Sequence, residues 1–180
     1  KVAKAGLLWV VVSGPKAAYA LAEPYLAMFG RGSTYVGDGE LARIWKIAHN
    51  TMFGVIIQSL CEITVLAEKA GIPRHVFLES INDSVLGSMY TRYKTPALVN
   101  LDFTTTLTPK LLLKDLELGM GAAKAQGVTM PTASVTRESL QSLANQYPGD
   151  IDFSVLLVEL ARAAGMKLEP ENVKVGDGLA

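Results

Sequence analysis

Lys46 and Asn50 are the residues of this chain whose types and spacing best suit chemistry. They lie four positions apart, so a helix would place them one turn apart on the same face. An ammonium and a carboxamide arranged in this way can hold and protonate one substrate oxygen. Gly37 and Gly39 come shortly before them and allow a ligand or another backbone to approach closely. Lys-x-x-x-Asn is common on helices, so the pair by itself more often marks a solvated face.

Lys114 is a second candidate, since it follows three leucines and precedes Asp115 and another leucine. A lysine in such an apolar stripe either extends along the surface to water or reaches into a pocket, and alone it favours the first. Arg92, Tyr93 and Lys94 equally fit a substrate mouth and a solvated face. The sequence contains no HExxH, CxxC, P-loop or GxSxG pattern, so metal, phosphoryl-transfer and serine-hydrolase chemistry have no support.

Composition narrows the class of protein. The 17 basic and 17 acidic residues give a formal net charge of zero, so no electrostatic footprint indicates a nucleic acid or a membrane surface as partner. Apolar residues make up 49% of the chain, which indicates surface buried against another domain or subunit. The sequence contains no run of 18 consecutive apolar residues, so it does not predict a membrane-spanning helix. The single cysteine, Cys61, reads as core filler and fits a cytoplasmic location.

The first segment has the pattern of an α/β domain. Leu7 to Ser13 is a short apolar run that predicts a buried strand, and Ser33 to Val36 predicts a second one. Pro15 to Phe29 between them predicts a helix. A strand, a helix and a strand of this length match the end of an α/β sheet domain.

From Glu40 onwards the sequence is helical. Glu40 to Ala70 predicts one long helix that is apolar on all sides after Asn50, and such a helix must be buried on all sides. We therefore predict a mainly α fold, a helical bundle around one long central helix that also forms a dimer. A helix of this kind leaves little room for an exposed stripe, so Lys46 is expected to face a cleft beside His49. The shorter helices are predicted at Arg74 to Ile81, about Val85 to Val99 with an interruption at Pro96, Pro109 to Gln126, Pro131 to Gln146 and Asp152 to Ala164.

The order and spacing of several motifs resemble the β-hydroxyacid dehydrogenase family, which includes 3-hydroxyisobutyrate dehydrogenase and tartronate semialdehyde reductase. The matching residues are Gly37-Asp38-Gly39, Lys46-Ile47-Ala48-His49-Asn50, Lys114-Asp115-Leu116, Gly127 and Pro131. The Lys-x-x-His-Asn form is also similar to 6-phosphogluconate dehydrogenase. The resemblance runs from about Val2 to Leu160.

One departure from the family pattern concerns the lysine. Most relatives have it four residues after the second glycine, where this chain has Arg43, whereas Lys46 comes seven residues after Gly39. We assign the role to Lys46, because the His-Asn pair follows it in register and because arginine does not deprotonate at working pH.

The resemblance implies three regions. Residues 1–37 would be the end of a truncated Rossmann-type NAD(P)-binding domain, residues 38–168 an all-helical C-terminal dehydrogenase domain, and residues 169–180 a loose polar tail. The family's substrate loop and its Gly-x-Gly-x-x-Gly cofactor domain would precede residue 1. The fragment alone is therefore expected to be inactive.

The resemblance also implies the reaction, which is the interconversion of a β-hydroxyacid and its oxo form with NAD or NADP. Lys46 would be the acid/base, Asn50 would hold the substrate oxygen or carboxylate, and Lys114 would approach the nicotinamide side of the cofactor, with no metal involved. The expected partners are a small hydroxyacid, the missing nucleotide-binding domain and further copies in a homodimer or homotetramer, with no nucleic acid or membrane. The alternatives are a non-catalytic helical dimerisation or binding module and an imine reductase-like enzyme, although retention of Lys46 argues against the latter.

Overall fold

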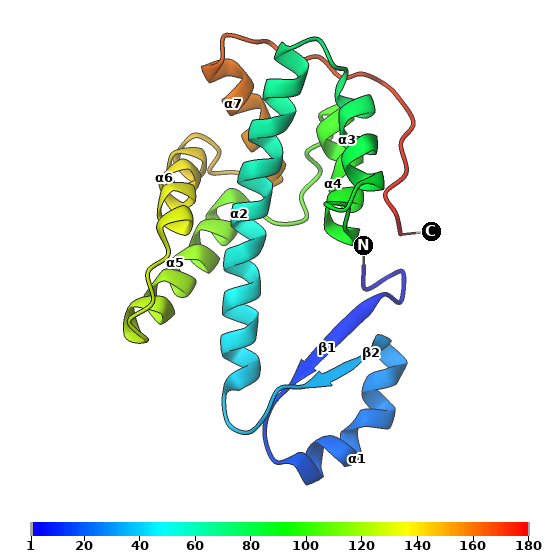
Figure 1. Ribbon diagram of the computed structural model, residues 1–180, viewed down its shortest axis with the longest axis vertical. Coiled ribbons are helices and arrows are strands. Elements are labelled where there is room, and N and C mark those ends of the chain that lie inside the picture. Colours follow the sequence, from blue (N-terminus) through cyan, green and yellow to red (C-terminus); the bar gives the residue numbers. More distant parts are fainter. Residues whose placement is uncertain (1, 180) are drawn as a thin grey trace. The chain divides into compact units, whose positions relative to one another are not determined.

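The computed structural model describes residues 2–179, which are mainly helical (Figure 1). The chain divides into two compact units. The sheet unit comprises the described residues up to His49 together with Leu179, and the helical unit runs from Asn50 to Gly178. The division falls within the long helix α2 (Leu41–Lys69).

The sheet unit contains the predicted strand, helix and strand. Strand β1 (Leu8–Val12) and strand β2 (Gly30–Tyr35) pair in parallel, with Val12 opposite Tyr35 at one end of the ladder. Parallel neighbours need a crossover connection, and helix α1 (Lys16–Leu26) with a 3₁₀ turn, η1 (Ala27–Phe29), provides it. This confirms the predicted order of strand, helix and strand.

The sheet unit lacks a core. None of residues 2–49 is buried, and several of its large apolar side chains are exposed. Parallel sheets are normally covered on both faces. The sheet of β1 and β2 therefore exposes apolar surface that a parallel sheet usually buries. The exposed side chains on β1, α1 and η1 are Trp9, Leu21, Tyr25, Met28 and Phe29.

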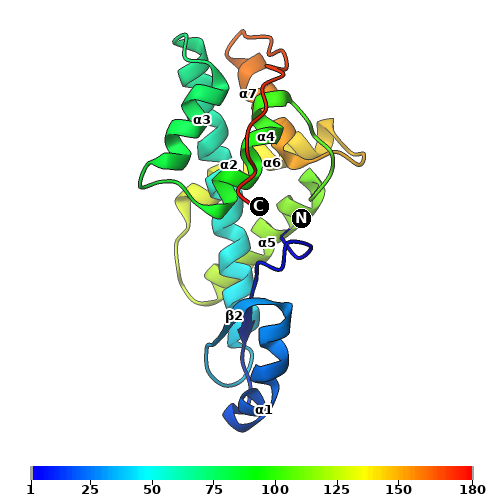
Figure 2. The same cartoon turned by 90° about the vertical axis from the view of Figure 1, so that its right-hand side faces the viewer.

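The helical unit is built around the part of α2 that follows Asn50. Figures 1 and 2 show the other helices of this unit placed around that part of α2. These are α3 (Arg74–Asp83), α4 (Met89–Asn100), α5 (Pro109–Ala125), α6 (Pro131–Gln146), the 3₁₀ turn η2 (Phe153–Val155) and α7 (Leu156–Ala163). Ile57 and Cys61 of α2 are fully buried among leucines from α3 to α7 and Phe153. The predicted mainly α bundle around one long helix is therefore confirmed.

Within the single chain, helix α2 is not buried on all sides. Its buried residues alternate with exposed apolar ones, of which Met52 and Leu66 keep 64% and 70% of their surface. By length and composition α2 could also cross a membrane, with a mean hydropathy of 1.4 over an 18-residue window. Half of that window is buried inside the structure, as in the core helix of a folded bundle, so this composition is weak evidence for a membrane span.

Helix α4 begins later than predicted and is not interrupted. The Ser88 side chain accepts a hydrogen bond from the Thr91 backbone N–H, and the Thr91 side chain accepts one in return from the Ser88 N–H. This capping box fixes the start at Met89, so residues from Val85 to Ser88 lie outside the helix. The helix continues through Pro96 to Asn100.

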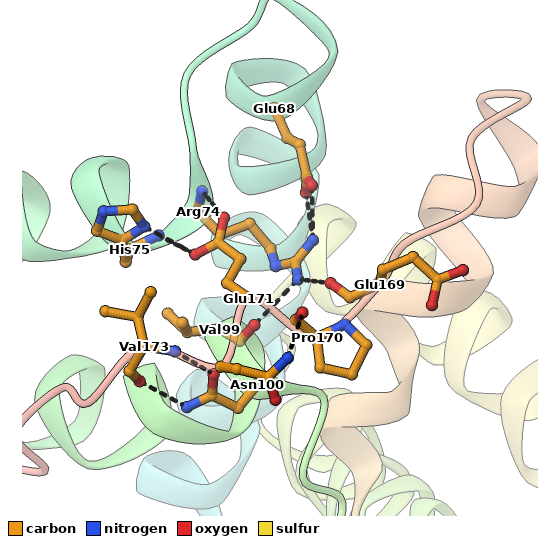
Figure 3. Close-up of polar contacts among 10 residues, drawn as sticks. Glu68, Arg74, His75, Val99, Asn100, Glu169, Pro170, Glu171 and Val173 are labelled. Carbon is orange, nitrogen blue, oxygen red and sulfur yellow. Dashed lines mark hydrogen bonds and ion pairs between the residues drawn. The ribbon is translucent and has the colours of Figure 1, made fainter.

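The C-terminal tail is docked, which corrects the expectation that it is loose (Figure 3). The fully buried Arg74 guanidinium donates to the Glu68 carboxylate, at 2.6 Å, and to the backbone carbonyls of Val99 and Glu169. Burying a guanidinium is costly unless most of its donors are paired, and the tail supplies one of the acceptors. Sequence patterns do not reveal this contact, because Arg74 and Glu169 are far apart in the chain.

The next residues of the tail bind α3 and α4. Both oxygens of the Glu171 carboxylate accept backbone N–H bonds at the start of α3, from Arg74 at 2.7 Å and His75 at 2.9 Å, and His75 Nδ1 lies 2.9 Å from one of them. An anionic cap of this kind satisfies the orphan donors of a helix N-terminus. Asn100 exchanges two hydrogen bonds with the backbone of Val173. The Glu171 side chain and the backbone of Val173 therefore hold the tail on the bundle.

Candidate functional site

The predicted site residues lie on two helices. Lys46 and Asn50 lie four positions apart on α2, within one uninterrupted helix, as the sequence predicts. Lys46 belongs to the sheet unit and its side chain is exposed, so the described residues do not enclose it in the expected cleft. The rings of Trp45 and His49 stack beside it at 5.0 Å, one turn apart.

Asn50 and Lys114, both in the helical unit, are brought together by a third residue. The Asn50 carboxamide donates from Nδ2 to Oδ2 of Asp115 at 2.8 Å, which links α2 to α5. The Lys114 ammonium lies 2.8 Å from the other oxygen, Oδ1. In the sequence, Asp115 is marked only by the Lys-Asp-Leu motif, where its position next to Lys114 is the one signal for a role.

Local sequence explains why α5 presents this pair. Pro109 occupies the first turn, where a missing N–H costs nothing, and the Thr108 side chain accepts from the Leu111 N–H as the N-cap. Leu112 and Leu116 are fully buried on the core face of the helix. Asp115 is next to that face and partly covered, whereas Lys114 lies further towards solvent.

Lys94 is neither part of a solvated face nor part of a substrate mouth, so both readings of this residue are wrong. Its side chain is buried, and its ammonium donates to Oδ1 of Asp152 at 2.8 Å and to Thr106 at 3.1 Å. It also lies 4.0 Å from the centre of the Phe153 ring. The donors are engaged inside the bundle, so this lysine ties α4 to the segment before α7.

Asp152 is the acceptor in this ion pair. Burial by itself raises the pKa of the Asp152 carboxyl, but the Lys94 charge and hydrogen bonds from Lys94, Ser154 and Thr106 outweigh burial and hold it below its ordinary value. Ser154 and Thr106 also donate to this carboxylate from their backbone N–H groups, each at 3.0 Å. The charged Asp152 carboxylate is therefore the common acceptor for Lys94, Thr106 and Ser154 in the core.

Cys61 is fully buried, as its interpretation as core filler predicts, and burial raises the pKa of its thiol far above the ordinary value. Such a thiol is unreactive while the bundle is folded. Within residues 2–179, no group of three or more His, Cys, Asp or Glu side chains is placed to hold a metal ion.

A groove of about 490 Å³ lies between α6 and α7, away from the predicted residues. Its polar lining includes Ser139, Gln146 and Glu159, and the last of these already accepts a hydrogen bond from the Tyr147 hydroxyl at 2.7 Å. None of Lys46, Asn50 and Lys114 lines it. The groove therefore does not contribute to the candidate site.

The residues present fit part of a dinucleotide site. The Lys114 side chain is 57% exposed and pairs with Asp115 from the solvent side, so its ammonium can turn to a bound ligand at little cost. A cation next to the Asn50 carboxamide suits the polar end of a nicotinamide cofactor.

Comparison with known proteins agrees with this arrangement. A family model described as the NAD-binding domain of NADP-dependent 3-hydroxyisobutyrate dehydrogenase matches residues 39–160, which include Lys46, Asn50 and Lys114. The chain is 27% identical over 164 residues to glyoxylate/succinic semialdehyde reductase 2 of Arabidopsis thaliana, covering 91% of this chain and 46% of the relative. It is 28% identical over 161 residues to mitochondrial 3-hydroxyisobutyrate dehydrogenase of Drosophila melanogaster, covering 86% and 50%.

Solved structures show the same likeness. The crystal structure of 3-hydroxyisobutyrate dehydrogenase from Salmonella typhimurium superimposes with a TM-score of 0.78 at 27% identity, over 87% of this chain and 55% of that one. The chain thus spans about half the length of the relatives it matches. Because the family model matches well over half of the chain, this protein belongs to the NADP-dependent 3-hydroxyisobutyrate dehydrogenase family, of which it contains the C-terminal helical domain.

Proposed function

We propose that this chain is the C-terminal part of an NAD(P)-dependent oxidoreductase of the 3-hydroxyisobutyrate dehydrogenase type, which interconverts a β-hydroxyacid and its oxo form. The observation that carries the proposal is the placement of Asn50 beside the Lys114–Asp115 pair, within the segment that matches the family. Lys46 lies one turn before Asn50 on the same helix.

Each residue has a distinct role in the proposed reaction. Bound NAD or NADP supplies the hydride acceptor and donor. Lys46 takes the hydroxyl proton during oxidation and returns one to the carbonyl oxygen during reduction. Asn50 holds the substrate oxygen or carboxylate by hydrogen bonds, and Lys114 faces the cofactor. No metal takes part in this scheme.

The exposed apolar surfaces of the chain would each be covered by a partner. The nucleotide-binding domain would continue the sheet of β1 and β2 and cover residues such as Trp9, with its boundary at residues 37 and 38 and the helical domain extending to 168. A second copy of the chain, in a homodimer or homotetramer, would cover Met52 and Leu66 of α2. We place the enzyme in the cytoplasm, where a single buried thiol remains reduced.

The test compares two cationic residues of α2 in the full-length protein. Lys46→Ala should lower turnover by roughly two to four orders of magnitude, because a general acid–base contributes about that much. The affinity for NADPH, followed by its fluorescence, should stay nearly unchanged. Arg43→Ala is the matched control, since the Arg43 guanidinium pairs with Glu40 at 2.8 Å on the surface. Unimpaired turnover in Lys46→Ala, or its loss in Arg43→Ala, would exclude the assignment.

A non-catalytic dimerisation or binding module is the second candidate, because Lys46 is exposed and does not line the small cavity beside Val12 and Tyr19. The two functions differ in cofactor binding. Titration of the full-length protein with NADH and NADPH should give saturable binding if it is a dehydrogenase. A folded full-length protein that binds neither would favour the module.

A further inference from the structure

Asp115 uses both of its carboxylate oxygens to join two residues of the candidate site. Oδ2 accepts from Asn50 Nδ2 and Oδ1 faces the Lys114 ammonium, each at 2.8 Å. The Asp115 side chain is only 13% exposed, whereas that of Lys114 is 57% exposed. The carboxylate is therefore the anchored member of the trio, and the lysine is the mobile one.

The contact with Asn50 determines which way the carboxamide faces. An amide has a donor end and an acceptor end of nearly the same shape, and only the hydrogen-bond partners distinguish them. An ionised carboxylate accepts but cannot donate, so Asp115 can bond only to the NH₂ end of Asn50. The Oδ1 atom of Asn50 must then point away from Asp115. A charge-assisted bond in a partly buried position holds this orientation more firmly than a neutral bond would.

The contact with Lys114 acts differently. Consecutive residues of a helix point in different directions, so Lys114 and Asp115 would not meet without an attraction between their charges. The ion pair brings the Lys114 ammonium to the carboxylate that also binds Asn50. Because the Lys114 end of this ion pair is exposed to solvent, the ammonium can exchange it for contact with a ligand without disturbing the Asn50 bond.

We propose that Asp115 is a positioning residue that orients the Asn50 carboxamide towards the substrate and holds the Lys114 ammonium beside it only until a ligand binds. This inference rests on the proposed dehydrogenase function and names a residue on which that function depends. Asp115 touches neither substrate nor cofactor in this scheme, and it acts through Asn50.

A double-mutant cycle in the full-length enzyme tests the coupling. Asp115→Ala should lower kcat for hydroxyacid oxidation by about 10- to 100-fold, since a misplaced polar group costs about that much. In the Asn50→Ala background the same substitution should lower kcat by less than about threefold, because the residue that it orients is already absent. Asp115→Asn should retain more activity than Asp115→Ala, because its amide oxygen can still accept from Asn50 Nδ2.

Glu117→Ala is the matched control. It removes a carboxylate from the same helix, where Glu117 pairs with Arg137 at 3.0 Å on the surface, and it should leave kcat unchanged. The side-chain amide resonances of Asn50 in the ¹⁵N–¹H spectrum give a readout that does not need activity. They should shift, and their protons should exchange faster, in Asp115→Ala but not in Glu117→Ala.

The outcomes separate the two proposals. If the wild type is active and Asp115→Ala lowers kcat by the same factor with and without Asn50, the positioning role is wrong and the dehydrogenase function stands. Unchanged Asn50 amide resonances in Asp115→Ala would also overturn it. If the full-length wild type oxidises no hydroxyacid and binds no dinucleotide, the function itself fails.

Discussion

The sheet unit and the helical unit both have regular secondary structure, but they differ in what holds it together. In the helical unit, leucines from five helices surround Ile57 and Cys61 with almost no exposed surface. In the sheet unit, two parallel strands and one helix are held by backbone pairing and a few side-chain bonds, with no residue buried. Since burial of apolar surface is the dominant favourable term in folding, most of the stability of this chain must reside in the helical unit.

The same contrast bears on function. Two-stranded sheets are marginal by themselves, and parallel ones are normally buried on both faces. The sheet unit thus shows the local pattern of a larger domain without its packing. The helical unit, which contains Asn50, Lys114 and Asp115, has a complete core to position them. This difference makes the sheet unit the part of the chain that is least stabilised by its own packing.

The largest expected effect is a separation of the two units during unfolding, and the chain contains a reporter for each. Both tryptophans, Trp9 and Trp45, belong to the sheet unit, and the single cysteine, Cys61, is buried in the helical unit. In urea, tryptophan fluorescence should change at a lower denaturant concentration than far-UV circular dichroism. Labelling of Cys61 by a thiol reagent should be slowed by about a thousandfold or more in the native state and follow the dichroism transition.

If all three transitions coincided, the two units would unfold as one, and the inferred difference in their stability would be wrong. The comparison becomes sharper in the full-length protein. There the fluorescence transition should move to higher urea, since the rest of the nucleotide-binding domain would cover Trp9.

The next largest effect is expected for the buried ion pair of the helical unit. Asp152→Ala should lower the free energy of unfolding by about 3–5 kcal/mol, because it leaves the Lys94 ammonium buried without its partner. Asp150→Ala, an exposed aspartate two positions away, is the matched control and should change it by less than about 0.5 kcal/mol. Urea unfolding followed by circular dichroism measures both. Equal effects of the two substitutions would show that the pair does not support the core.

The Lys94–Asp152 ion pair also predicts that the free energy of unfolding falls at acidic pH. The pKa of Asp152 is lower in the folded chain than in the unfolded one, so its carboxylate contributes stability fully above the unfolded pKa of about 4. That contribution is lost as the pH falls through the folded pKa. The difference in unfolding free energy between the wild type and Asp152→Asn should therefore shrink between about pH 6 and about pH 3. A difference that stays constant over this range would contradict the lowered pKa.

The smallest effect is a contrast between two glycines of α5. A Cβ added at Gly119 would lie 1.8 Å from Oγ1 of Thr51, whereas one added at Gly121 would meet nothing within 4 Å. Gly119→Ala should cost about 1–3 kcal/mol through overpacking. Gly121→Ala should stabilise by up to about 1 kcal/mol, because alanine is the better helix former. Thermal unfolding of the two variants measures the contrast, and the close packing of α2 on α5 would be refuted by equal melting temperatures.

Local signals in the sequence predicted the elements well. The apolar run before Gly14-Pro15 identified β1, and proline at the first position marked the starts of α5 and α6. The start of α4 was missed, because the Ser88–Thr91 capping box was not recognised. The order and spacing of Lys46, Asn50 and the Lys-Asp-Leu motif were sufficient to predict the family that the comparison shows.

What the sequence by itself determined is therefore the set of helices and strands, the family and the candidate residues, because these depend on periodicity, caps and motif spacing within short segments. Only the tertiary structure decided how distant polar groups pair. Lys94 meets Asp152 across 58 positions, Asn50 meets Asp115 across 65, and the Arg74 backbone meets Glu171 across 97. The sequence alone does not show whether a charged side chain will be exposed to water or buried in a core. Its environment is set by which elements pack together, and that depends on burial of the apolar faces of the whole unit.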